Sequence, residues 1–126
     1  MRGYSDAVLH HFHSPHRVGE VEPPRRLARR ENPVCGDVAE FSVRVQGGRL
    51  DQVRFRAFGC VAAIASCSCL AGLVEGRSPE EALSVGVEEL LEQLGGLPSS
   101  KTHGAQLAVQ AFRAALEGFE TPVKTS

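Results

Sequence analysis

The sequence predicts an α+β domain, in which a small antiparallel β-sheet carries an N-terminal helix and several C-terminal helices. Apolar and polar residues alternate on both sides of Gly47-Gly48, which is typical of a β-hairpin with one buried face. One short helical pattern precedes the hairpin, and only helical patterns follow it. At 126 residues, 42% of them hydrophobic, the chain can bury a core, so we expect a single domain over residues 1–126.

The first predicted element is a short amphipathic helix that ends near Phe12. Ser5 and Asp6 can cap its N-terminus, and Val8, Leu9 and Phe12 share its apolar side. The Ser-Pro dipeptide that follows disfavours further helix, because the residue before a proline avoids the helical conformation.

Residues 19–34 show no clear period and contain four prolines or glycines. We interpret them as a loop, with at most a short edge strand. Four arginines in this segment are interpreted as solvated loop residues rather than as a docking patch; they are Arg25, Arg26, Arg29 and Arg30.

The β-hairpin is the clearest structural signal. Pairing Phe41 with Phe55 and Val43 with Val53 makes the apolar residues face one another, whereas a one-residue slip would expose the whole set. This register leaves a loop of about three residues at positions 47–49.

The same register brings distant residues together at the open end of the hairpin. Extended beyond the strands, it places Gly36 opposite Cys60, so that Cys35 and Cys60 meet there. Asp37 stands two residues after Cys35, and on a continuing strand both side chains leave the same face. His103 opens the last predicted helix, where the helix dipole favours the neutral imidazole that binds metals. Two cysteines, an aspartate and a histidine form a plausible ligand set for iron or zinc.

Four helices follow the hairpin. The first, from Val61 to about Glu75, is apolar all round and therefore buried on several sides. A capping box with a proline at the first helical position starts the second at residues 78–81. The third runs over residues 87–94 and stops at a Gly-Gly pair. The last begins near His103 and its C-terminal tail, about residues 120–126, is expected to be flexible. Its inward stripe consists of Leu107, Ala108, Ala111, Phe112, Ala115 and Phe119.

Three of the four cysteines lie in FGCVAAIASCSCLAG, residues 58–72. On a helix, Cys67 lies close to Cys60 around the axis but roughly 10 Å along it, too far for a disulfide and long for one zinc ion. Cys67 and Cys69 point to opposite sides, so they cannot form a thiol–disulfide pair unless the helix unwinds. Cys60 precedes the helix, whose dipole favours the thiolate. We expect Cys69 to be a small buried hydrophobic residue, whereas a contact between Cys67 and the metal ligands stays open.

These motifs together resemble the NifU-like, or IscU-type, iron–sulfur cluster scaffold family. YSDAVLHHFHSPHRVG looks like the family's N-terminal helix and turn, and CGD at 35–37 matches its first cysteine motif. FGC followed by AIAS at 63–66 matches the second motif, and EGRSPEEA matches the segment after that helix. LPSSKTH at 97–103 resembles the stretch before the last ligands. The match is collinear from Tyr4 to about Phe119.

The resemblance implies a SufE/NifU-like α+β fold and a non-enzymatic scaffold or carrier. Such a scaffold holds a transient [2Fe-2S] cluster, receives sulfur from a cysteine desulfurase and passes the cluster to recipient iron–sulfur apoproteins. Carried over by position, Cys35, Cys60 and His103 are cluster ligands, and Asp37 is the acidic residue of the site. Lys101 matches a family lysine near the site.

Two departures from the family pattern matter. Gly104 stands where the family has a third cysteine, a cluster ligand widely held to accept sulfur. Either Asp37, which we prefer, or Cys67 would then be the fourth ligand. The segment that a dedicated chaperone recognises in many members reads LPPVK, but here it reads LPSSK, so the match to a chaperone site is incomplete.

Three other functions fit the sequence less well. A zinc-bound sulfur-transfer partner of a desulfurase would hold a single Zn or Fe ion, but such relatives carry an insertion that this chain lacks. A degenerate member would act only through protein interaction. No nucleophile with a recognisable base partner supports a hydrolase. The histidines of the N-terminal segment, of which His10 and His13 share a helix side, could bind metal adventitiously; they are His10, His11, His13 and His16.

Charge and hydropathy exclude further classes. A formal net charge of −1 argues against attraction to nucleic acid or membranes. No apolar run approaches the roughly 18 residues that cross a bilayer, and the N-terminus lacks the apolar core of a secretory signal. We therefore expect a cytoplasmic protein with reduced thiols.

Overall fold

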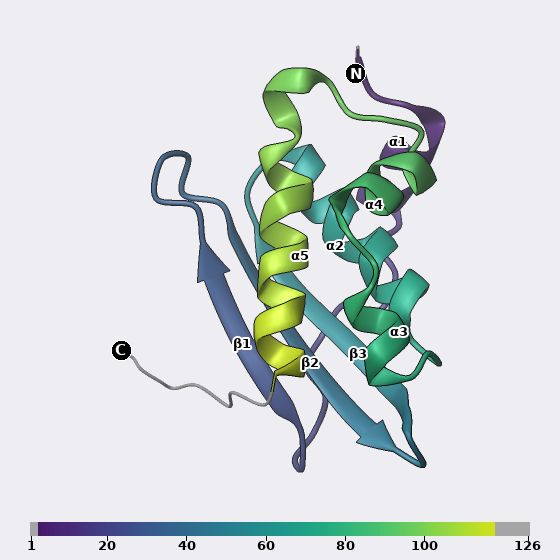
Figure 1. Ribbon diagram of the computed structural model, residues 1–126. Coiled ribbons are helices and arrows are strands. Elements are labelled where there is room, and N and C mark those ends of the chain that lie inside the picture. The colour runs from purple at the N-terminus through teal and green to yellow at the C-terminus, as the bar shows by residue number, and fades with distance from the viewer. Residues whose placement is uncertain (1–2, 118–126) are drawn as a thin grey trace.

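A three-stranded antiparallel sheet with the order β1-β2-β3 forms the base of the fold. The computed structural model describes residues 3–117. Two helices, α2 (Val61–Val74) and α5 (His103–Leu116), lie on one face of the sheet, as predicted for an α+β domain (Figure 1). The other elements are β1 (Arg26–Glu31), β2 (Val38–Gln46), β3 (Arg49–Phe58), α1 (Asp6–His13), α3 (Pro79–Leu83), α4 (Val87–Gln93) and the 3-10 turn η1 (Ser99–Lys101).

The β2–β3 hairpin has the predicted register, since Phe41 pairs with Phe55 and Val43 with Val53. The predicted loop length was wrong by one residue. Gln46 already pairs with Arg49, so the loop consists of the two glycines between them, both with positive φ. An irregularity in the ladder after Arg44 absorbs the extra residue. Two consecutive residues with positive φ suit a two-residue hairpin loop.

The segment predicted as a loop contains a six-residue edge strand, β1, which pairs with β2 from Arg26 to Glu31. Only Ala28 is buried in this strand, so the sequence carries no alternating pattern. Two of the arginines have specific partners. Arg25 donates to Glu20, and Arg26 donates to the backbone carbonyl of Leu116 at the end of α5.

The predicted helices are present within one or two residues of their expected ends. Ser5 caps α1 by accepting the N–H of Val8, and Ser78 forms the predicted capping box with Glu81. The predicted inward stripe of α5 is buried as far as Ala115, while its last member and the tail at 120–126 lie outside the described residues. Within residues 3–117, no helix is long and apolar enough to cross a membrane.

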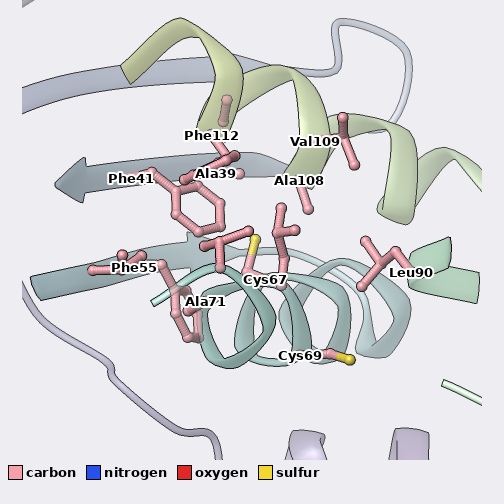
Figure 2. Close-up of a cluster of buried hydrophobic side chains, with 14 of the residues drawn as sticks. Ala39, Phe41, Phe55, Cys67, Cys69, Ala71, Leu90, Ala108, Val109 and Phe112 are labelled. Carbon is pink, nitrogen blue, oxygen red and sulfur yellow. The ribbon is translucent and has the colours of Figure 1, made fainter. Parts of the chain in front are cut away.

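The hydrophobic core lies between the sheet, α2 and α5. Cys67 is fully buried in it and points toward Phe41 and Ala108, whereas Cys69 lies on the opposite side of α2 (Figure 2). Burial raises the pKa of Cys67, and it raises the pKa of Cys69 to about 11. Both thiols therefore behave as small apolar groups, and the interpretation of Cys69 as a buried hydrophobic residue is confirmed.

Candidate functional site

Four side chains with metal-ligand chemistry gather at the open end of the β2–β3 hairpin, where α2 and α5 begin. The ligand atoms of Cys35, Asp37 and His103 all lie within 4.8 Å of one another. The thiol of Cys60 donates a hydrogen bond of 3.3 Å to Asp37 Oδ2 and so joins the same group. We call Cys35, Asp37, Cys60 and His103 the four-residue site. The hairpin register predicts that Cys35 and Cys60 meet at this end; both lie near Asp37, but Cys60 is not among the three residues whose ligand atoms all lie within 4.8 Å of one another.

Asp37 is the centre of the four-residue site. Its side chain is buried, and its carboxylate lies against the first residues of two different helices. Oδ1 accepts the backbone N–H of Cys60 at 3.3 Å, and Oδ2 lies 3.6 Å from His103 Nε2. A buried carboxylate needs such polar partners, because burial without them costs several kcal/mol. Asp37 therefore connects the start of β2 with the first residues of α2 and α5.

The loop before β2 holds Cys35 at the surface above this carboxylate. Asn32 Oδ1 accepts the N–H of Val34 at 2.9 Å, and its backbone carbonyl accepts the N–H of Gly36. Asn32 N–H in turn donates to the carbonyl of Asp37, which closes the loop. Sequence reasoning missed Asn32, although asparagine commonly bonds to the backbone two residues ahead.

Gly59 is a second residue that sequence reasoning missed. Its φ is +141°, and a Cβ at this position would lie 2.2 Å from Asp37 Oδ1. Only glycine therefore lets the end of β3 pass the carboxylate. The FGC motif contained this glycine, but its role depends on a contact between distant segments.

The thiol of Cys60 does not follow the expectation from the helix dipole. Burial raises the pKa of Cys60, and the neighbouring Asp37 carboxylate raises it further. Backbone N–H groups of Ala63 and Ala62 act in the opposite direction but do not outweigh these effects. The prediction that the helix N-terminus favours the thiolate was therefore wrong in its net sign.

The first turn of α5 lies directly against the first turn of α2. A Cβ at Gly104 would lie 2.8 Å from the carbonyl carbon of Ala62 and from the backbone nitrogen of Ala63. This close approach positions His103 beside Asp37. Lys101 lies two residues earlier, in η1, and is half-buried.

Exposed side chains lie in and close in sequence to the four-residue site. Cys35 is exposed, whereas Cys60 is half-buried. Val34 is 94% exposed and Phe58 is 70% exposed, and each lies within two residues of a cysteine of the site. Cys67 lies elsewhere, in the hydrophobic core (Figure 2).

The chain is similar to known proteins in sequence and in fold. Residues 3–126 match the family model of the NifU-like N-terminal domain. The chain is 40% identical over 113 residues to the iron–sulfur cluster assembly scaffold protein IscU 1 of Archaeoglobus fulgidus, covering 90% of this chain and 74% of that protein. It is 35% identical over 118 residues to the corresponding Aquifex aeolicus IscU, covering 92% and 75%. The crystal structure of a NifU-like protein (N-terminal) from Brucella abortus shares the fold, with a TM-score of 0.77 at 15% identity over 90% of this chain and 92% of that one.

Proposed function

Because the chain belongs to the family of NifU-like N-terminal domains, we propose that it is an iron–sulfur cluster assembly scaffold. In this proposal the four-residue site holds a transient [2Fe-2S] cluster as cargo and passes it to recipient apoproteins. A cysteine desulfurase would supply the sulfur, and the cytoplasm would keep the thiols reduced. The observation that carries the proposal is the meeting of two cysteines, a buried aspartate and a histidine at one open end of the fold.

The donor set suits a cluster that must be released. Iron–sulfur clusters are held mainly by thiolates, and histidine can replace cysteine on one iron. Cys35 and Cys60 would supply the two thiolates, with His103 as third ligand and Asp37 as fourth. Carboxylate and imidazole are harder ligands than thiolate, so they hold the cluster less tightly than a third cysteine would. Asp37 supports this role because its Oδ2 lies within reach of the other ligands.

The exposed surroundings support delivery and transfer between proteins. Partners must reach the cargo, and Cys35 lies at the surface. Val34, next to Cys35 in the sequence, and Phe58, two residues before Cys60, are both exposed and could contact a partner protein. Lys101 lies in η1, two residues before His103, and is the basic residue that precedes this ligand in the sequence.

Anaerobic reconstitution tests the proposal. The purified full chain is incubated with ferrous iron and sulfide, desalted, and measured for its visible spectrum and its iron and sulfide contents. We expect sulfide-to-iron charge-transfer bands and nearly equal amounts of iron and sulfide. Cys35→Ser and Cys60→Ser should each abolish the cluster, because each removes one of the two thiolates.

Controls separate ligands from core residues. Cys69→Ser and Cys67→Ala should retain the cluster, and a loss in a folded Cys67→Ala variant would show that Cys67 is the fourth ligand. A protein that binds no sulfide would contradict the scaffold function. Tightly bound zinc in that sample would instead favour a zinc-bound sulfur-transfer partner, since three ligand atoms within 4.8 Å also suit a single ion.

A further inference from the structure

Three histidine rings gather on the side of α2 that faces α1, apart from the four-residue site. His10 and His11 lie on α1, and His16 lies in the turn that follows it. Their ring centroids are 5.7 Å apart for His10–His11, 5.3 Å for His10–His16 and 5.0 Å for His11–His16. We call these three residues the histidine cluster. Its contact on α2 is Ser68, about 12 Å along the helix axis from Cys60.

The histidines that lie close together in the structure differ from the pair that helical periodicity places on one side. On helical periodicity His10 and His13 share a side, but the ring of His13 lies against Phe12, at a centroid distance of 5.3 Å. The turn after α1 instead brings His16 back toward His10 and His11. His13 is thus an exposed histidine on the same short segment that takes no part in the cluster.

The spacing of the rings is the spacing of imidazoles around one metal ion. With metal–nitrogen bonds of about 2.1 Å and tetrahedral angles, the centroids of two ligating rings lie about 5.3 Å apart. All three observed distances fall within 0.4 Å of that value. The interplanar angles of 74°, 80° and 57° show that the three rings are not stacked in parallel.

Ser68 holds the least exposed ring of the cluster in place. Its hydroxyl lies 2.8 Å from His11 Nδ1 and accepts the backbone N–H of His16, also at 2.8 Å. With Nδ1 engaged by Ser68, Nε2 is the nitrogen of His11 that is free for a metal, which is the usual arrangement of a ligating histidine. Burial lowers the pKa of His11, and the neighbouring His16 and His10 lower it further, which favours the neutral imidazole.

We propose that His10, His11 and His16 bind one divalent first-row transition-metal ion, such as Zn²⁺, with the fourth position open to water. Within the described part of the chain, three ligand atoms already lie within 4.8 Å only at Cys35, Asp37 and His103. Metal binding therefore requires His10 and His16 to turn a nitrogen inward. Both rings are exposed and can rotate about their Cβ–Cγ bonds, while Ser68 keeps His11 fixed.

Cobalt titration of the full chain tests the site apart from the scaffold function. The Cys35→Ser/Cys60→Ser double variant is used as the background, because it removes both thiolates of the four-residue site. We expect about one equivalent of Co²⁺ with the visible bands of a nitrogen–oxygen site, no thiolate-to-cobalt charge transfer, and displacement by Zn²⁺. His10→Ala and His16→Ala should each weaken Co²⁺ binding by about tenfold or more.

His13→Ala is the matched control and should leave the affinity unchanged, because His13 lies outside the cluster. Absence of Co²⁺ binding in the double variant would overturn the proposal. It would also be overturned if His13→Ala weakened binding as much as His16→Ala, because the segment would then bind metal without a defined site. Neither result would affect cluster reconstitution at the four-residue site in the parent chain.

Discussion

Asp37 is the single residue on which the geometry of the four-residue site depends most. It is buried, accepts two hydrogen bonds from Cys60 and lies beside His103. The carboxylate can occupy this position because Gly59, the residue after β3, has no side chain. Any side chain at Gly59 would overlap the carboxylate. One aspartate and one glycine, 22 positions apart, thus act as a single structural unit.

Gly104 gives the first prediction at the residue scale. A Cβ at this position would lie 2.8 Å from two backbone atoms of α2, so α5 must shift to admit any side chain. Such overpacking costs about 1–3 kcal/mol, and the better helix propensity of a non-glycine residue returns about 0.5–1 kcal/mol. We expect Gly104→Ala and Gly104→Cys both to lower the free energy of unfolding by about 1–2 kcal/mol, measured by urea denaturation.

The comparison of the two variants identifies the cause. Because the overlap begins at Cβ, the cysteine should cost about as much as the alanine. A Gly104→Cys variant more stable than the parent chain would show that α5 and α2 readily move apart. Restoring the family's third cysteine is thus expected to require an adjustment of the whole first turn of α5.

At the scale of elements, α1 is attached to α2 through a buried hydroxyl. Ser68 accepts the N–H of His16 and bonds to His11, so one side chain holds both the end of α1 and the turn after it. Ser66, two residues earlier on the same helix, is equally buried, and its hydroxyl has no hydrogen-bond partner within the described residues. Ser66 can therefore serve as a control for Ser68, because the two are equally buried but only Ser68 has these hydrogen bonds.

Alanine substitutions at the two serines should differ clearly. Ser68→Ala removes the part-buried hydrogen bonds to the His16 N–H and to His11 Nδ1, each worth about 0.5–1.5 kcal/mol, and should lower the free energy of unfolding by about 1–3 kcal/mol. Ser66→Ala removes a buried hydroxyl that has no hydrogen-bond partner among residues 3–117 and should change stability by less than about 0.5 kcal/mol or increase it. Denaturant unfolding of both variants provides the measurement. Equal losses in the two would mean that Ser68 contributes packing volume rather than hydrogen bonds.

The elements also show which features a sequence can reveal. The β2–β3 hairpin is predictable because one face of it is buried, so that apolar and polar residues alternate along its sequence. The strand β1 cannot be predicted in this way, because Ala28 is its only buried residue and backbone pairing with β2 holds it in place. The four ligand candidates followed from register and helix starts. The raised pKa of Cys60 could not be predicted from the sequence, because its causes, burial and the neighbouring Asp37 carboxylate, exist only in the folded protein.

At the scale of the whole molecule, the four-residue site joins three segments that are far apart in the sequence. Cys35 and Asp37 come from the loop that leads into β2, Cys60 from the start of α2, and His103 from the start of α5. The core holds α2 and α5 against the sheet, but the loop from Asn32 to Asp37 is closed by only a few hydrogen bonds of its own. A bound cluster would therefore tie the loop to both helices.

This connectivity predicts that loading with a cluster stabilises the fold. A ligand present at about 100 times its dissociation constant stabilises the native state by about 2.7 kcal/mol, which corresponds to a rise in Tm of about 5 °C or more for a chain of this size. We expect such a rise for the reconstituted protein in anaerobic thermal unfolding followed by circular dichroism. The loop amides of residues 34–37 should also exchange with solvent more slowly. Cys69→Ser should reproduce the full rise, whereas Cys35→Ser should show none, because it removes the only ligand thiol that the loop contributes. A rise that persisted in Cys35→Ser would place the stabilising iron elsewhere, and the loop would then have no part in holding the cluster.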